Sequence, residues 1–159
     1  MTDPGIERPN VHVEDALLTR RSIRAFLDKP VPKPLLRRIL ESARWAPSGS
    51  NIQPWKVHAL TGNSLSNYTE AIFSAAQNGE AREMEYHYYA PKWSEPFLSR
   101  RRACGFGLYE AMGIKREDKE SRNQAYMANF KFFGAGTGLL FWIPSDLEHG
   151  SWLDYGTFI

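Results

Sequence analysis

Two short stretches of the sequence carry polar side chains of the kinds that bind ligands. The first, TRRSIRAF at residues 19–26, places three arginines around a serine. The second, APSGSNIQPW at residues 46–55, holds hydroxyl and amide side chains between two prolines: Ser48, Ser50, Asn51 and Gln53. Arginine and serine bind phosphate, whereas amide side chains both donate and accept hydrogen bonds. Together the stretches predict a ligand with a phosphate at one end and a flat ring with amide-like edges at the other.

The pyrimidine side of a flavin is a ring edge of this kind. Reduction builds negative charge on that side, and a fixed arginine there makes the reduced form more accessible. Taken alone, an arginine run is more often a solvated helix end, and a segment such as PSGSNIQP is more often a surface turn. The hypothesis therefore depends on the two stretches occurring together.

The composition is that of one soluble domain without a strong charge. Of the 159 residues, 42% are hydrophobic and 24% charged, and the formal net charge is +2. This small charge argues against nucleic acid or an anionic membrane as partner. A single cysteine, Cys104, excludes an internal disulfide, argues against a cysteine-rich metal site and fits a cytoplasmic location. The longest nearly uncharged stretch, 134–144, is far shorter than the roughly 20 residues of a membrane span.

The first half of the chain predicts elements that would position these stretches. Residues 1–11 lack the apolar run of a signal peptide, and we expect a flexible arm there. Apolar spacing predicts a short helix over 12–20, which delivers the arginines at its C-terminal end. The prolines of 28–34 predict an extended connector, followed by a second helix that begins near Pro34 and ends before Pro47. Alternation predicts a strand at 55–62, and a helix follows over 63–78, opening on Asn63 or Ser64.

The second half is expected to contain one irregular stretch. Residues 80–105 are crowded with aromatic side chains and include the run Arg100, Arg101 and Arg102, so we expect an irregular excursion that covers something. A helix is predicted over 115–133, and a strand buried on both faces over 138–143. From Asp146 onward a last helix carries apolar residues, among them Trp152 and Phe158, that we expect to be covered by a following segment or by another chain. We therefore expect the sequence to be incomplete at its C-terminus.

In order and spacing, these motifs strongly resemble the nitroreductase family of FMN-dependent oxidoreductases. The match runs from RRSIRAF through the proline connector to ESARWAPSGSNIQPWKVHAL, over residues 15–60, and continues more loosely through 100–118, 129–141 and 150–159. The resemblance implies an α/β (α+β) fold, in which a mixed, mostly antiparallel sheet is wrapped by helices. It also implies a domain-swapped homodimer with two FMN sites at the interface. Residues 12–159 would form the domain, with an insertion at about 80–114.

The resemblance also implies roles for individual residues. Arg20 would bind the FMN phosphate with support from Arg21 and Ser22, and Arg24 would approach the N1 and O2 edge of the flavin. Asn129 would read the same pyrimidine edge. From the second chain of the dimer, the ring and its tail would be lined by Pro47, Ser48, Gly49, Asn51 and Gln53.

The implied activity moves a hydride from NAD(P)H through FMN to a nitroaromatic or quinone-type acceptor. The flavin carries this chemistry, so no catalytic side chain and no metal are expected. Family members continue beyond Ile159, with a further basic contact to the phosphate and a donor near flavin N5. Two alternatives therefore stay open, a non-catalytic fragment that binds flavin or an aromatic ligand, and an oligomeric scaffold without flavin. NADH and NADPH are not distinguished, since the chain has no G-x-G-x-x-G fingerprint.

Overall fold

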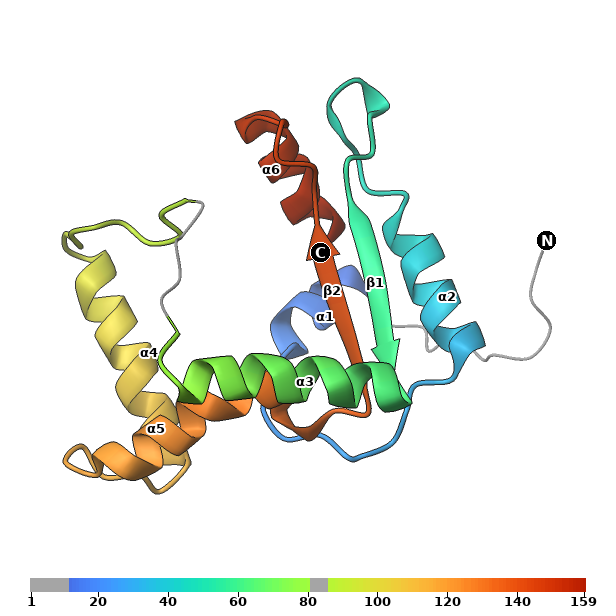
Figure 1. Ribbon diagram of the computed structural model, residues 1–159. Helices are drawn as coiled ribbons and strands as arrows, with labels where there is room; N and C mark the ends of the chain where they lie inside the picture. Colours follow the sequence, from blue (N-terminus) through green and yellow to red (C-terminus); the bar gives the residue numbers. More distant parts are fainter. Residues whose placement is uncertain (1–11, 81–85) are drawn as a thin grey trace.

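A two-stranded antiparallel sheet joins the two halves of the chain in the computed structural model, which describes residues 12–80 and 86–159. Strand β1 (Lys56–Thr61) pairs with β2 (Thr137–Trp142), with Lys56 opposite Trp142 and Thr61 opposite Thr137. Helices surround the sheet (Figure 1), so the predicted α/β class with antiparallel pairing is confirmed. The predicted arm at 1–11 and residues 81–85 of the predicted irregular stretch lie outside the described residues.

The N-terminal part follows the predicted order closely. Helix α1 (Val13–Thr19) leads into an extended segment, 20–32, and then into α2 (Lys33–Ala43), which has a proline in its first turn. Two hydrogen bonds hold the extended segment against the start of β2. The Phe26 amide donates to the Phe133 carbonyl at 3.2 Å, and the Val31 amide donates to Thr137 Oγ1 at 2.9 Å.

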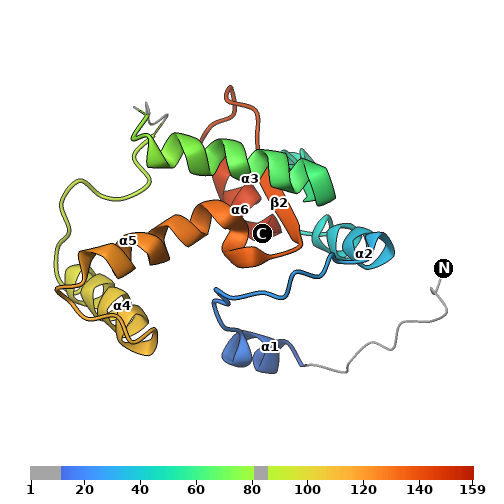
Figure 2. The same ribbon diagram turned by 60° about the horizontal axis from the view of Figure 1, so that its bottom comes forward.

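Helix α3 (Gly62–Gln77) follows β1 directly and crosses the sheet near the end of β1 (Figures 1 and 2). Its N-cap is Thr61, so the predicted start at Asn63 or Ser64 was slightly late. A capping box explains the earlier start, because the Thr61 side chain accepts from the Ser64 amide while Ser64 Oγ accepts from the Thr61 amide at 3.1 Å. Leu65, in the first turn of α3, is one of the two buried apolar side chains of the core among the described residues.

The predicted irregular stretch at 80–105 was wrong in its second half, which forms helix α4 (Phe97–Ala111). The Glu95 carboxylate closes the first turn by accepting from the Ser99 amide at 3.3 Å and from Ser99 Oγ at 2.6 Å. The arginines that follow are good helix formers. The density of aromatic residues before Pro96 concealed this start.

The predicted helix at 115–133 is two elements. Helix α5 (Lys119–Met127) is capped by Asp118, whose side chain accepts from the Ser121 amide at 2.9 Å and from Ser121 Oγ at 2.7 Å. These hydrogen bonds lower the pKa of the Asp118 carboxyl group. A 3-10 turn, η2 (Ala128–Gly134), follows, and Phe132 and Phe133 adopt left-handed φ values of 48° and 52°. This conformation ends the 3-10 turn and leads the chain into the next strand.

Strand β2 is not buried on both faces, contrary to the prediction. Gly138 is its only buried residue, and Trp142 remains 44% exposed. Among the described residues the strand has one neighbour, β1, so its other edge carries no paired strand. The apolar run GLLFWI therefore indicated a strand correctly but did not indicate its burial.

Helix α6 (His149–Phe158) closes the opposite end of the sheet and begins three residues later than predicted. The Phe158 ring stacks on Trp55 with a centroid distance of 4.8 Å and meets the Phe141 ring edge-on at 6.1 Å. Phe158 is therefore buried by its own chain, contrary to expectation, whereas Leu153 and Ile159 stay exposed. No helix of the described residues is long and apolar enough to span a membrane.

Replacing Gly136 by alanine tests how the extended segment is seated on β2. The new Cβ would lie 2.7 Å from the Lys29 carbonyl carbon and 2.8 Å from the Pro30 nitrogen. Both are backbone atoms that cannot rotate away, so we expect a loss of about 1–3 kcal/mol in the free energy of unfolding in urea. Gly107, in the interior of α4, has no atom within 4 Å of its added Cβ and is the control. Gly107→Ala should leave stability unchanged or raise it by up to about 1 kcal/mol, and equal losses in both variants would contradict the account.

Candidate functional site

Arg24 and Asn129 face one pocket, although 105 positions of the printed sequence separate them. The extended segment supplies Arg24, and Asn129 lies at the start of the turn after α5. The pocket has a volume of about 240 Å³ and is lined by both of these residues together with Leu108, Tyr109, Met112, Ala125, Tyr126, Ala128 and Phe133. The structure thus brings together the two residues to which the family resemblance gives the same ring edge.

Both polar side chains keep hydrogen-bonding capacity free in this pocket. Asn129 Nδ2 donates to the Tyr126 carbonyl at 2.7 Å, which orients the amide, and its oxygen accepts no hydrogen bond within the described residues. Arg24 Nη1 donates to the Ser22 carbonyl at 3.3 Å, and no acidic group among the described residues pairs with this guanidinium. A ring edge with both a donor and an acceptor would find a partner for each.

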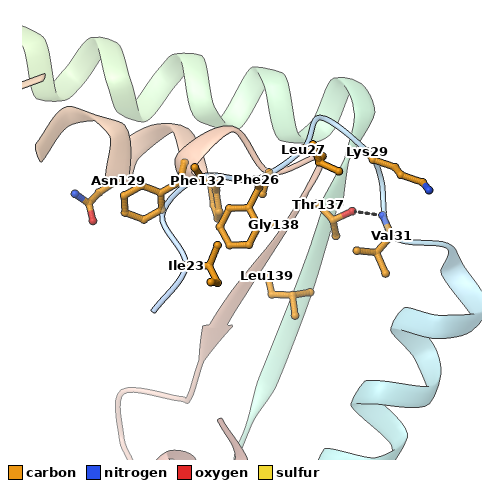
Figure 3. A pocket seen from close by; sticks show the side chains of 14 residues that line it. Ile23, Phe26, Leu27, Lys29, Val31, Asn129, Phe132, Thr137, Gly138 and Leu139 are labelled. Carbon is orange, nitrogen blue, oxygen red and sulfur yellow. Dashed lines mark hydrogen bonds between the residues drawn. The ribbon is translucent and has the colours of Figure 1, made fainter. Parts of the chain in front are cut away.

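A larger and mostly apolar pocket of about 780 Å³ lies beside the first. It is formed by the extended segment, the η2 turn and the start of β2 (Figure 3), and its lining includes Ile23, Phe26, Leu27, Val31, Phe132 and Leu139. Asn129 and Phe133 line both pockets. A polar edge and an apolar surface therefore adjoin each other, as a flat heteroaromatic ligand requires.

Arg20, Arg21 and Ser22 follow α1 directly and are exposed. Arg21 Nη1 donates to the carbonyls of Leu18 at 3.0 Å and Arg20 at 2.9 Å, so this guanidinium caps the C-terminal end of α1. Arg20 has no acidic partner within the described residues. Of the three, Arg20 and Ser22 are the side chains with free capacity for an anion.

The turn at 47–53 has an unusual backbone that is fastened at several points. Ser50, Asn51 and Gln53 all adopt left-handed φ values, between 48° and 55°. Ser48 Oγ accepts from the Gln53 amide at 3.0 Å, which closes the turn. Such conformations cost free energy and persist where the surrounding structure imposes them. This backbone strain marks the turn as a candidate binding element.

Two residues of α6 hold this turn in place, and the sequence did not indicate either of them. Asp154 Oδ1 accepts from the Gly49 amide at 3.0 Å, and the Thr157 hydroxyl is shared between the Pro47 carbonyl at 3.1 Å and the Asp154 carbonyl at 2.7 Å. They lie about a hundred positions away from the turn, so no local pattern could have linked them. The two bonds keep Gly49 and its neighbours fixed while the Asn51 side chain stays exposed.

The two predicted halves of the site do not meet within one chain. The extended segment with Arg20–Arg24 runs along the bottom of Figure 1, whereas the turn at 47–53 lies at the top, beyond α2. No hydrogen bond joins the two segments, and neither of the two pockets is lined by both. The described residues also contain no cluster of His, Cys, Asp and Glu able to hold a metal ion.

The mixed α/β fold of the chain matches that of a known family. The chain belongs to the nitroreductase family, whose family model matches residues 17–158. It is 35% identical over 148 residues to the chloronitrobenzene nitroreductase of Comamonas testosteroni, and 36% identical over 151 residues to the 4-nitrobenzoate reductase of Pseudomonas putida. These alignments cover 92% and 89% of this chain, but 65% and 61% of the two relatives, so the chain spans about two thirds of their length or less.

Solved structures agree with this assignment. The crystal structure of the FMN and NADPH-dependent nitroreductase NfnB from Sphigopyxis sp. strain HMH superposes with a TM-score of 0.89 at 36% identity, covering 93% of this chain and 67% of that one. The FMN-dependent NfnB from Mycobacterium smegmatis in complex with NADPH gives a TM-score of 0.84 at 28% identity, with coverages of 91% and 65%.

Removing the Asp154 carboxylate tests whether α6 fixes the turn. In Asp154→Ala the Gly49 amide loses its acceptor, and its hydrogen exchange should become about fivefold faster, equivalent to about 1 kcal/mol. Asp146 is an exposed acid before α6, so Asp146→Ala is the matched control and should leave Gly49 unchanged. Unaltered Gly49 exchange in Asp154→Ala would show that other contacts hold the turn.

Proposed function

We propose that this protein is an FMN-dependent oxidoreductase that passes electrons from NAD(P)H to nitroaromatic or quinone-type acceptors. Family membership supports the proposal, as do the curated relatives, which are named as reductases of chloronitrobenzene and 4-nitrobenzoate. The similar solved structures are titled as FMN and NADPH-dependent nitroreductases. A domain spanning 12–159, with an insertion at about 80–114, is part of this proposal.

The observation that carries the proposal is the convergence of Arg24 and Asn129 on one pocket. The pyrimidine edge of a flavin carries carbonyl oxygens that accept hydrogen bonds and an N3–H that donates one. The free guanidinium of Arg24 complements an oxygen, and the amide oxygen of Asn129 complements the N–H. The neighbouring apolar pocket offers carbon atoms to the rest of the ring system.

The phosphate of FMN would lie near the end of α1, where Arg20 and Ser22 have free donors. Arg21 would contribute mainly by holding the local backbone, since its guanidinium is engaged with two carbonyls. Bound FMN would supply the redox chemistry, which is hydride uptake from NAD(P)H and electron transfer to the acceptor. Arg24 would stabilise the negative charge that accumulates at the pyrimidine edge.

A second copy of the chain would complete the site. Pro47, Ser48, Gly49, Asn51 and Gln53 lie apart from the arginines in one chain, so they would line the ring of the other copy. Large apolar side chains on α1 and after α2 are uncovered, with exposures of 78% for Val13, 67% for Leu17 and 87% for Trp45. Burying these side chains is the driving force expected for such a homodimer.

Two arginine variants separate the affinity for FMN from the midpoint potential of the bound FMN. Arg20→Ala removes a charged contact to phosphate and should weaken FMN binding about tenfold to a hundredfold, measured by flavin fluorescence titration. Arg24→Ala should change affinity less but lower the midpoint potential of bound FMN, on the order of 30 mV, because reduced flavin loses a stabilising cation.

Arg37 is an exposed arginine on α2 and provides the control, since Arg37→Ala should change neither quantity. Equal effects of Arg20→Ala and Arg24→Ala on both measurements would reject the division of roles.

The parent protein tests the cofactor itself. Absence of flavin absorbance after reconstitution with FMN would reject FMN as the cofactor. Flavin retention without NADPH oxidation in the presence of menadione or 4-nitrobenzoate would favour a ligand-binding protein instead.

The proposed dimer is tested by placing charge on its apolar surface. Sedimentation velocity of the purified protein should show a dimer, and Leu17→Glu or Trp45→Glu should shift it to monomer, because a buried unpaired charge is strongly unfavourable. The same variants should lose FMN, since the second copy lines the ring. Asn78→Glu, at the exposed end of α3, is the control and should remain dimeric. A monomeric parent protein that retains FMN would contradict the shared site.

A further inference from the structure

Helix α4 presents three consecutive arginines, Arg100, Arg101 and Arg102, that the proposed flavin site does not use. All three are exposed, and none pairs with an acidic residue of the described chain. They are the fourth to sixth residues of α4, directly after its first turn. The nearby Glu95 carboxylate is engaged by Ser99 instead. No acidic residue of the described chain thus offsets these three neighbouring cations, a pattern typical of functional positions.

Aromatic rings lie directly beside this arginine cluster. The Arg101 guanidinium lies over the Trp93 ring, 5.6 Å from its centroid. Tyr89 and Trp93 have centroids 5.7 Å apart, and Tyr88 meets Tyr89 edge-on at 4.7 Å. Tyr88 and Tyr89 are 75% and 60% exposed. The cluster therefore combines concentrated positive charge with exposed flat surfaces, to which a heteroaromatic base can stack.

The arginine cluster lies on a helix that reaches the Arg24–Asn129 pocket. Arg101 and Leu108 are seven residues apart on α4, which places them on the same face and about 10 Å apart along the axis. Leu108 lines the pocket. In Figure 1 the last turns of α4 meet α5, while its first turns point away from the sheet. A ligand in contact with both places must be elongated and must carry an anion at its far end.

We propose that Arg100–Arg102 bind the 2′-phosphate of NADPH, with the adenine ring on the Trp93 and Tyr89 rings, and so select NADPH over NADH. This inference rests on the proposed function, which puts the flavin edge in the Arg24–Asn129 pocket, so that the nicotinamide must lie near that pocket for hydride transfer. A phosphate monoester carries nearly two negative charges at neutral pH and matches several guanidinium groups. A carboxylated nitroaromatic carries one charge on a single ring and is too short to connect the two places.

The binding test uses nucleotides without a nicotinamide, so it does not depend on flavin. By calorimetry, adenosine 2′,5′-bisphosphate should bind at least about tenfold more tightly than adenosine 5′-monophosphate. Arg101→Gln and Arg102→Gln should each lower the affinity for the bisphosphate about tenfold and leave the affinity for the monophosphate unchanged. Arg116→Gln is the matched control, because Arg116 also lies over an aromatic ring, Phe106, at 5.1 Å. It should bind both nucleotides like the parent protein.

Cys104 provides a second measurement in the same protein. It is exposed and lies one turn beyond Arg100 and Arg101, so a ligand on the arginines should shield it. Adenosine 2′,5′-bisphosphate should slow its alkylation by a neutral maleimide at concentrations where the monophosphate does not. The sulfhydryl serves only as a reporter here.

Several outcomes would overturn the inference. One is equal affinity for the two nucleotides, and another is an equal loss in Arg101→Gln and Arg116→Gln. Protection of Cys104 by 4-nitrobenzoate, but not by the bisphosphate, would assign the arginines to a carboxylated substrate.

Failure of the proposed function would look different. Loss of FMN binding with intact 2′-phosphate discrimination would reject the flavin proposal and support the nucleotide site.

Discussion

The antiparallel pairing of β1 with β2 is the interaction on which the rest of the structure depends. It joins residues 56–61 to residues 137–142, and the elements that bear the site are attached at its two ends. At one end, Thr137 and Phe133 anchor the extended segment that carries Arg24. At the other end, Phe158 stacks on Trp55 and sets α6 against the turn at 47–53. Without this pairing neither half of the candidate site would have a fixed position.

Backbone strain occurs at both of those ends. Phe132 and Phe133 are left-handed where the chain leaves α5 and enters β2, and Ser50, Asn51 and Gln53 are left-handed before β1. Non-glycine residues adopt such conformations when the neighbouring structure imposes them. In each case a hydrogen bond from a distant segment provides that constraint, at the Phe133 carbonyl and at the Gly49 amide. The strained segments therefore adjoin the surfaces that we propose bind the cofactor.

Large apolar side chains and three neighbouring arginines remain exposed among the described residues. Among the described residues only Leu65 and Phe158 form a buried apolar core, while Trp45 is 87% exposed. The proposed second copy, placed on α1 and the end of α2, would cover Trp45 together with Val13 and Leu17. The arginines of α4 are a different case, because covering a cation is costly unless an anion pairs with it.

The sequence by itself determined most elements and the family. Apolar spacing located α1, α2 and α3, alternation located β1, and the motifs at 19–26 and 46–55 indicated the family that the family model confirms. These features are local, because capping, proline geometry and side-chain periodicity act over a few residues. The start of α4 was missed because one side-chain contact, from Glu95 to Ser99, decides it. The burial of β2 was misjudged because burial depends on neighbours that a run of apolar residues does not reveal.

Only the tertiary structure decided how distant residues meet. It placed Arg24 and Asn129 on one pocket and separated both from the turn at 47–53. It also disclosed Asp154 and Thr157 as the residues that hold this turn. The physical reason is the same in each case, since these contacts depend on strand register and on packing between segments about a hundred positions apart. Local sequence patterns determine which elements form, and the pairing of β1 with β2 determines which side chains those elements bring together.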